Sequence, residues 1–261
     1  MTPDPDAAVL DGLRVLVLIG VGEHGDPWHG LEATGGRAGE VLRGAGAAVE
    51  VLGTDRADAL PGALARSDLL VVAVSGDPAL PPPDSTALVD AICTHEARGG
   101  GVLGLHSATL AFAGDPRWAE LLGGRWVPGV SGHPPIGEAL VRRARALPEL
   151  AVPVQLPVPE FVVHDERYSD LEVSGEVETV AFHTEGGVEH PLVWVKRATA
   201  NPSSATAGRA TAGRATAGQA TAGRVAYDAL GHGVESYDSP EHRRLLVALA
   251  RWAVPAASTD A

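Results

Sequence analysis

Cysteine is nearly absent from this sequence of 261 residues, which contains only Cys93. A single cysteine excludes an internal disulfide, so the fold must hold without covalent cross-links. Cys93 lies inside a predicted helix, where a cysteine usually behaves as a small hydrophobic side chain. We therefore interpret Cys93 as a core residue and not as a displaced catalytic nucleophile.

Positive charge is also scarce. The chain has 20 lysine and arginine residues against 33 aspartate and glutamate residues, which gives a net charge of -13. Basic runs extend no further than pairs such as Arg142-Arg143. Because a surface of this sign repels nucleic acid and anionic membrane surfaces, neither is expected as a partner.

Long apolar runs are missing as well. No uninterrupted apolar stretch approaches the roughly 20 residues that a helix needs to cross a bilayer. The first six residues, from Met1 to Asp6, are acidic and proline-rich, whereas a signal peptide begins with a basic segment followed by an apolar one. The sequence therefore predicts a cytoplasmic protein.

What is present is a regular alternation of strands and helices in the first half. With 45% hydrophobic residues, the chain can bury the core of one large domain. Short apolar runs predict buried strands, and amphipathic segments between them predict helices. Such alternation indicates parallel strands with helices on both faces, a three-layer α/β fold. The predicted strands cover residues 13–20, 49–52, 68–74 and 101–105, and the predicted helices cover 34–45, 84–98 and 240–254.

Four tandem copies of Ala-Thr-Ala-Gly-Arg/Gln interrupt the second half, beginning at Ala205, Ala210, Ala215 and Ala220. A period of five fits neither helix nor strand, and these small residues bury little apolar area. We predict one domain over residues 12–254, interrupted by a low-complexity loop at 198–223. Residues 1–11 and 255–261 are predicted to be flexible ends.

His106 stands at the predicted turn from the fourth strand to the next helix, at Gly104-Leu105-His106-Ser107-Ala108. In α/β hydrolases and cysteine amidotransferases this turn exposes the nucleophile. An imidazole here suits proton transfer or metal ligation better than acyl transfer. Other segments that follow predicted parallel strands should converge on the same sheet edge. They are Gly22-Glu23-His24, His29 and Ser75-Gly76-Asp77.

Further polar clusters lie at predicted strand ends in the second half. Asp165, Glu166 and Tyr168 follow the apolar run at 161–163, His190 precedes the run at 192–195, and His232 follows the run at 225–230. His133, which precedes two prolines, is equally well explained as a loop residue. Trp194 and Trp252 are expected in the core.

Taken in order, these motifs resemble the trehalose-utilisation (ThuA-like) family. The matching motifs are Gly99-Gly100-Gly101 with Gly104-Leu105-His106-Ser107-Ala108, Asp165-Glu166-x-Tyr168, His190-Pro191-x-x-Trp194, Gly223-Arg224-Val225-x-Tyr227, Leu230-Gly231-His232 and Arg251-Trp252-Ala253. The chain departs from the family in the pentapeptide array. It also departs at Gly25-Asp26-Pro27-Trp28-His29, which matches the family's early histidine only approximately.

The resemblance implies a flavodoxin-like fold of the class I glutamine amidotransferase type, with the cysteine nucleophile replaced by His106. It also implies a role in bacterial catabolism of trehalose and related disaccharides, beside sugar dehydrogenases that form 3-keto sugars. A small carbohydrate is then the expected ligand and a sugar dehydrogenase the expected functional partner. Assembly into a homo-oligomer stays open.

Two chemistries and one non-catalytic role fit the candidate residues. Acid–base chemistry next to a sugar carbonyl would use Glu166 or His106 as base, with His232 or Tyr168 donating to the oxygen. Catalytic roles are therefore predicted for His106, Glu166 and His232, and substrate-binding roles for His29, Asp165, Tyr168 and His190. A divalent metal, as in a metal-dependent sugar hydrolase, would draw its ligands from His106, Glu166, His190 and His232. The third reading is a sugar-binding accessory protein without catalysis.

Overall fold

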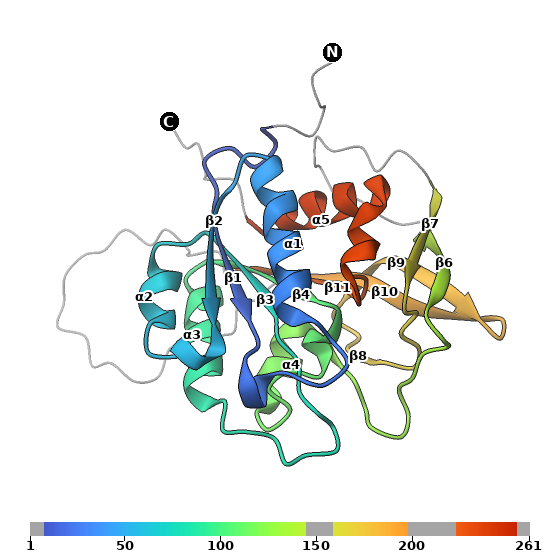
Figure 1. The fold of residues 1–261 in the computed structure, drawn as a ribbon, viewed down its shortest axis with the longest axis horizontal. Helices are drawn as coiled ribbons and strands as arrows, with labels where there is room; N and C mark the ends of the chain where they lie inside the picture. The colour runs from blue at the N-terminus through green and yellow to red at the C-terminus, as the bar shows by residue number, and fades with distance from the viewer. Residues whose placement is uncertain (1–7, 145–158, 198–222, 255–261) are drawn as a thin grey trace.

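The computed structural model describes residues 8–144, 159–197 and 223–254. Within these ranges the chain forms one nine-stranded sheet with helices on both faces, and a separate two-stranded sheet (Figure 1). The predicted three-layer α/β architecture is confirmed.

Five strands form the parallel half of the large sheet. Their order is β2 (Ala48–Gly53), β1 (Arg14–Ile19), β3 (Leu69–Ala73), β4 (Gly101–Leu105) and β11 (Arg224–Asp228). All neighbouring pairs in this group are parallel. Numbered along the chain within this half, the order is 2-1-3-4-5, which is the flavodoxin-like order. β3 and β4 are buried along their whole length, because helices cover both faces of the sheet.

The sheet continues beyond β11 with four antiparallel strands, so the sheet as a whole is mixed. In order these are β10 (Val188–Arg197), β9 (Glu178–Glu185), β6 (Gly137–Arg143) and β7 (Glu160–Asp165). β9 and β10 are joined by a two-residue turn and are antiparallel to each other. Gly186 and Gly187 in this turn both have positive φ angles, as two-residue hairpins require. The small sheet pairs β5 (Gly124–Arg125) with β8 (Glu172–Val173).

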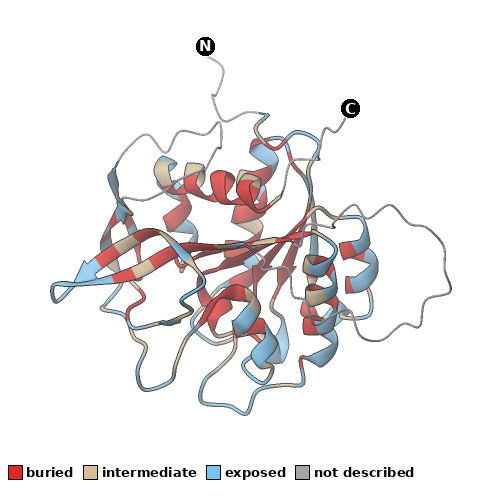
Figure 2. Ribbon diagram, turned by 180° about the vertical axis from the view of Figure 1, so that it is seen from behind, coloured by how far each residue is buried: buried red, intermediate tan, exposed pale blue. Residues whose placement is uncertain are grey.

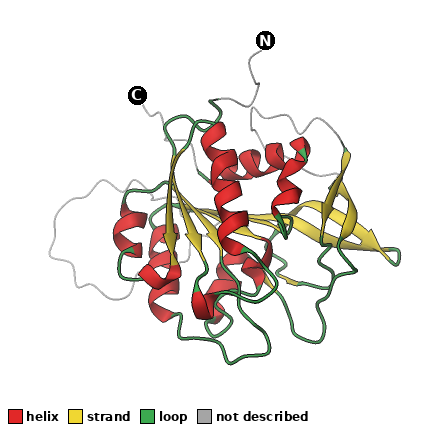
Figure 3. Cartoon of the chain, in the orientation of Figure 1, coloured by secondary structure: helices red, strands yellow, loops and turns green. Residues whose placement is uncertain are grey.

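Helices cover the sheet on both sides (Figure 3). α1 (Leu31–Gly44) and α5 (Pro240–Ala253) pack together on one face, while α2 (Leu60–Ala65), α3 (Thr86–Ala97) and α4 (Pro116–Leu122) lie on the other. The predicted N-cap of the last helix is confirmed, because the Ser239 side chain accepts a hydrogen bond from the backbone N–H of His242. One prediction was wrong: the segment after β4 is the short 3-10 helix η3 (His106–Thr109), and α4 begins only at Pro116.

The core lies between the sheet and its two helical layers (Figure 2). Trp194 is fully buried and Trp252 is 4% exposed, which confirms both as core residues. Leu10, within the predicted flexible N-terminus, is also fully buried, and its N–H donates to the carbonyl of Ala45. Burying one such leucine side chain stabilises a fold by about 1.5–3 kcal/mol. The packed part of the chain therefore includes Leu10.

Other expectations lie outside the described residues. These are residues 1–7 and 255–261 of the predicted flexible ends, and most of the pentapeptide array. Within the ranges that the structure describes, the helices are too short or too polar to span a bilayer.

Candidate functional site

Four chain segments meet at one edge of the large sheet. His29 lies between β1 and α1, His106 directly follows β4, and His232 follows β11. Glu166 directly follows β7. Successive antiparallel pairings from β11 through β10, β9 and β6 give β7 the same direction as the parallel strands. The ends of all four strands therefore point to the same edge, where ligands bind in such folds.

His106 occupies the elbow that the sequence predicted, in an unusual backbone conformation. Its φ angle is +41°, in the left-handed region that side chains other than glycine rarely adopt. Two hydrogen bonds hold the residue there. The Tyr227 hydroxyl donates to the backbone carbonyl of His106 at 2.6 Å, and the His106 Nδ1 donates to the carbonyl of Ala229, also at 2.6 Å. These bonds direct the His106 Nε2 toward the other site residues.

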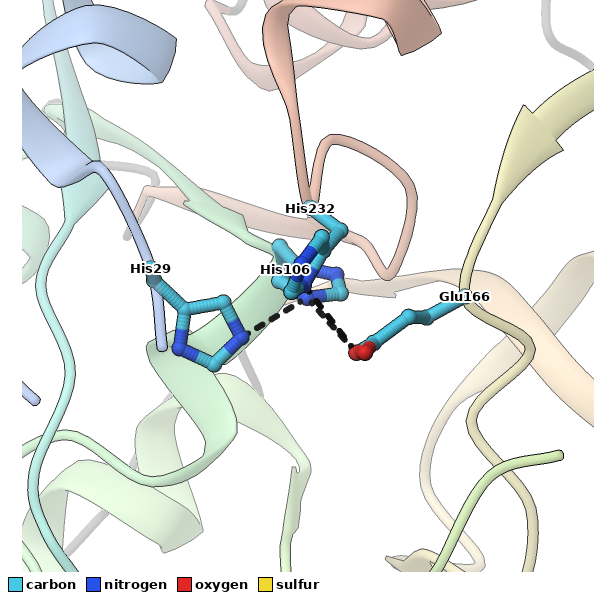
Figure 4. Close-up of side chains that lie close together, drawn as sticks. All are labelled: His29, His106, Glu166 and His232. Atoms are coloured by element: carbon cyan, nitrogen blue, oxygen red, sulfur yellow. Dashed lines mark hydrogen bonds and ion pairs between the residues drawn. The ribbon is translucent and has the colours of Figure 1, made fainter. Parts of the chain in front are cut away.

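His29 faces His106 across the site, with 3.1 Å between their Nε2 atoms (Figure 4). On its other side, the His29 Nδ1 lies 2.6 Å from the Asp26 carboxylate, which also accepts a hydrogen bond from the Ser75 hydroxyl. Burial works to raise the pKa of Asp26, but the hydrogen bonds from His29 and Ser75 outweigh burial and lower it to about 2. Asp26 is therefore an ionised acceptor that fixes the orientation of the His29 ring. Burial lowers the pKa of His29 itself, and the bond to Asp26 opposes this effect.

Glu166 lies between two imidazoles. Its Oε2 is 3.5 Å from the His106 Nε2 and 3.2 Å from the His232 Nδ1. Burial works to raise the pKa of Glu166, but the interactions with His106 and His232 are stronger and hold it well below its usual value. The same contact with Glu166 raises the pKa of His232.

Two more side chains border this group. The hydroxyl of the buried Tyr168 lies 2.9 Å from the His106 Nε2 and 3.4 Å from the His29 Nε2. Burial raises the pKa of Tyr168 well above its usual value, so its phenol stays protonated. His133 approaches from the loop between β5 and β6, with its Nδ1 3.5 Å from the Glu166 Oε1. His133 is thus a loop residue, and its ring lies beside Glu166.

Asp165 was predicted to bind substrate, but in the structure it is buried beside the cluster and binds backbone groups. It is 1% exposed and already accepts four hydrogen bonds. The donors are the backbone N–H groups of Glu166, Gly231 and His232 and the hydroxyl of Ser236. Successive residues in extended chain point to opposite sides, so Glu166 faces the cluster while Asp165 faces away from it. Asp165 therefore fixes the backbone at two site residues.

His190 does not join the group, contrary to its prediction as a substrate-binding residue and metal ligand. It is the third residue of β10 and not the residue before a strand. Its ring stacks on His183, with centroids 5.1 Å apart, and its Nδ1 accepts a hydrogen bond from the N–H of Asp170. β10 accommodates Pro191 because the pairing register shifts between Pro191 and Val193, as at a β-bulge.

The sequence interpretation missed Asp26 as a site residue and gave His133 no role. Asp26 precedes His29 by three residues in a tight turn, where its Oδ1 also accepts the N–H groups of Trp28 and His29. That spacing is the one signal that could have pointed to it. For His133 the sequence offers no signal, because the loop that carries it is placed by tertiary contacts.

The arrangement can support two kinds of chemistry. His29, His106, Glu166 and His232 each offer one ligand atom, and the four atoms lie within 4.8 Å of one another. Imidazole nitrogen and carboxylate oxygen are ligands of divalent metals. The same groups, with the Tyr168 hydroxyl, can also accept and donate protons. His29 and His106 further line a pocket together with Leu31, Ser107 and Tyr237.

Solved structures with this fold include two ThuA-like proteins. One, from Bacteroides uniformis ATCC 8492, has 17% sequence identity and a TM-score of 0.65, covering 99% of this chain and 96% of that chain. The other, from Parabacteroides merdae ATCC 43184, has 16% identity and a TM-score of 0.65, covering 95% and 92%. A cytoplasmic protein from Salmonella typhimurium LT2 has 14% identity and a TM-score of 0.53, covering 93% and 97%. At these identities the likeness concerns the fold alone. A search of curated protein sequences gave no match.

The family comparison agrees with the motifs and with the fold. The sequence model of the ThuA family, described as "Trehalose utilisation", matches residues 14–253, which include every strand and helix named above. The chain therefore belongs to the ThuA family.

Proposed function

We propose that this protein is an enzyme of carbohydrate catabolism that transfers a proton at a carbon next to the carbonyl of an oxidised sugar. The family description, "Trehalose utilisation", supports trehalose or a related disaccharide as the parent sugar. The oxidised form of such a sugar carries a ketone, and the hydrogens on the neighbouring carbons are weakly acidic. A base of modest strength and a donor to the developing enolate oxygen are enough for such a reaction.

One observation carries this proposal: a carboxylate, three imidazoles and a phenol converge at the ligand-binding edge of the sheet. Glu166 and His106 are the groups that can accept the proton. In the proposed reaction the Tyr168 hydroxyl, which lies 2.9 Å from the His106 Nε2, donates to the carbonyl oxygen of the sugar. Clusters of ionisable groups at such positions are usually functional.

Thioester chemistry of the amidotransferase type is not supported. The elbow after β4 carries His106 in place of a thiol, and Cys93 lies in α3, away from the strand ends. Burial raises the pKa of Cys93, which disfavours the reactive thiolate. The ketone that the proposed reaction needs must come from an oxidation, so we propose a sugar dehydrogenase as the functional partner.

Solvent exchange tests the proposal directly. The protein is incubated in deuterated water with trehalose, 3-keto-trehalose and simple glucosides, while NMR follows the hydrogens next to the carbonyl and any products. We expect exchange or turnover with a keto sugar only. Glu166→Gln should slow it by about 10²–10⁴-fold, as is typical when a general acid or base is lost.

Glu172→Gln is the matched control, since Glu172 is exposed and pairs with Arg125 on the small sheet. It should react as fast as the parent. If the folded parent binds a keto sugar without exchange or turnover, the result contradicts the proposal and favours a sugar-binding accessory protein. Failure to bind or change any of these sugars also overturns it.

A further inference from the structure

The tautomers of His29 and His106 are determined by their outer hydrogen bonds. A backbone carbonyl can only accept, so the His106 Nδ1 at 2.6 Å from the Ala229 oxygen must carry hydrogen. The His29 Nδ1 carries hydrogen for the same reason, because it lies 2.6 Å from a carboxylate that also accepts from Ser75. In the neutral rings, both Nε2 atoms therefore present lone pairs to the site.

These lone pairs face one another, and the single hydrogen of the Tyr168 hydroxyl, which lies 2.9 Å from the His106 Nε2 and 3.4 Å from the His29 Nε2, can satisfy only one of them. The two Nε2 atoms are 3.1 Å apart, and the Glu166 Oε2 is 3.5 Å from that of His106. The His232 Nδ1 is buried and makes no hydrogen bond, although it lies 3.2 Å from the same Glu166 oxygen. Electron-rich atoms held so close together need a positive charge at their centre.

The spacing of the four atoms matches a metal coordination shell. In tetrahedral or octahedral sites with bonds of about 2.0–2.2 Å, neighbouring ligand atoms lie roughly 2.8 to 3.6 Å apart. Three of the six separations in this cluster are 3.1, 3.2 and 3.5 Å, and all four atoms lie within 4.8 Å of one another. A proton shared between two of these atoms would not account for the approach of all four.

The surrounding residues hold the ligands as they do in metalloproteins. Asp26 orients His29 in a carboxylate–histidine pair, and the Ala229 carbonyl orients His106. Asp165 accepts the backbone N–H groups of both Glu166 and His232, so one buried carboxylate places two of the four ligands. Such outer contacts fix the ligand geometry before an ion arrives.

We propose that His29, His106, Glu166 and His232 bind one divalent first-row transition-metal ion. Three imidazoles and one carboxylate suit zinc, manganese, iron, cobalt or nickel, whereas calcium and magnesium prefer shells made of oxygen. The proposal deepens the proposed function, on whose site it rests. A bound ion supplies Lewis-acid polarisation of a sugar oxygen. With the ion bound, His106 and Glu166 act as ligands instead of as the base, and the Tyr168 hydroxyl remains as a proton donor beside the ion.

Metal content tests the proposal without an activity assay. The full chain is purified without a polyhistidine tag or chelator, and its metals are measured by elemental analysis. The protein is then stripped with a chelator and titrated with Co²⁺, whose visible absorption reports its ligands, and with Zn²⁺ in competition. We expect one ion per chain and a higher melting temperature with the ion bound.

Three variants and one control locate the ion. His106→Ala and Glu166→Gln should each remove a ligand and abolish stoichiometric binding. Asp26→Asn should keep the ligands but lower Zn²⁺ affinity by about 10- to 100-fold, as outer-contact changes do. His190→Ala is the matched control, because this buried histidine lies outside the cluster, and it should bind like the parent. Circular dichroism confirms that each variant is folded.

The two proposals fail separately. Absence of a stoichiometric metal together with a featureless Co²⁺ titration overturns the metal proposal, as does equal loss of affinity in His190→Ala. Sugar exchange by that metal-free protein would leave the proposed function standing, with Glu166 or His106 as base. Metal bound by these ligands without any reaction on a keto sugar would keep the metal site and refute the proposed function.

Discussion

At His106, one backbone angle decides what the side chain can reach. The φ angle of +41° turns the chain sharply after β4, so that the imidazole points along the sheet edge toward His29 and Glu166. For residues other than glycine, the left-handed region costs roughly 1–2 kcal/mol. The cost is tolerated because Tyr227 and Ala229 hold the turn through hydrogen bonds to His106. Backbone strain of this kind is concentrated at functional sites.

Two substitutions at His106 distinguish the cost of its backbone conformation from the contribution of its imidazole. His106→Ala and His106→Gly both remove the imidazole, but only glycine adopts a positive φ without steric cost. We expect the glycine variant to be more stable than the alanine variant by about 1 kcal/mol in urea unfolding. Both should lose function equally. An alanine variant as stable as the glycine variant would show that His106 is not strained.

At the scale of elements, a chain of buried polar groups ties α5 to the site. The His242 Nε2, on α5, lies 3.1 Å from the Asp228 carboxylate at the end of β11. The His242 Nδ1 lies 2.8 Å from the Ser236 hydroxyl, which donates to Asp165 at the end of β7. Asp165 in turn holds the backbone of His232. The helix, two strand ends and the His232 turn are therefore positioned together.

This chain of contacts predicts how stability depends on pH. Burial alone would lower the pKa of His242, but the charge and hydrogen bond of Asp228, with a contribution from Asp165, raise it above 6.5. The phenol of Tyr237 stacks on the same ring, and burial raises the pKa of Tyr237, so the phenol stays neutral. A raised folded-state pKa gives stability that is complete below the unfolded value of 6.5 and is lost as pH rises through the folded value. The stability difference between the parent and His242→Gln should therefore be constant below pH 6.5 and shrink above it.

His95 supplies a control with the opposite sign. Burial lowers its pKa to about 4. Its contribution to stability is therefore present above pH 6.5 and is lost as pH falls toward 4. The difference between the parent and His95→Gln, measured by urea unfolding across this range, should widen as pH rises. If both differences follow pH in the same direction, the assignment of His242 as a cation paired with Asp228 is wrong.

For the whole molecule, sequence patterns predicted the parallel half of the sheet better than the antiparallel half. The strands of the parallel half are short apolar runs, most of them separated by helical segments. That pattern predicts parallel strands and little else. β6 reads Gly-Glu-Ala-Leu-Val-Arg-Arg, and its three apolar residues are consecutive although only Ala139 and Val141 are buried, so the sequence shows no alternation of apolar and polar residues there. Nothing local to β6 or β7 specifies that they extend the sheet beyond β9.

In the site, too, residues marked by a local sequence pattern could be predicted, and residues placed by tertiary contacts could not. His106, Glu166 and His232 could be found because each follows an apolar strand. His190 was misplaced because Pro191 suggests a strand beginning, whereas β10 starts earlier and carries the proline at a register shift. Asp165 and Glu166 are adjacent carboxylates, and only the folded chain shows which of them faces the cluster.

The connection between β10 and β11 gives a last prediction for the molecule as a whole. These strands are antiparallel neighbours, and Arg197, the last residue of β10, pairs with Arg224, the first residue of β11. The two ends that the pentapeptide array joins therefore already lie side by side, so a much shorter connection can span them. Deleting residues 205–219 removes three whole repeats and keeps Ala-Thr-Ala-Gly-Arg at 220–224.

The deletion more than halves the connection, and closure entropy changes by only about 0.6 kcal/mol per halving. We expect a folded protein whose free energy of unfolding is unchanged or higher by roughly that amount. Urea unfolding measures the change, and metal binding and sugar exchange should match the parent, because the described site residues come from other segments. Loss of soluble protein, or a drop in stability of several kcal/mol, would mean that the repeats contribute to packing or assembly and are not a neutral insertion.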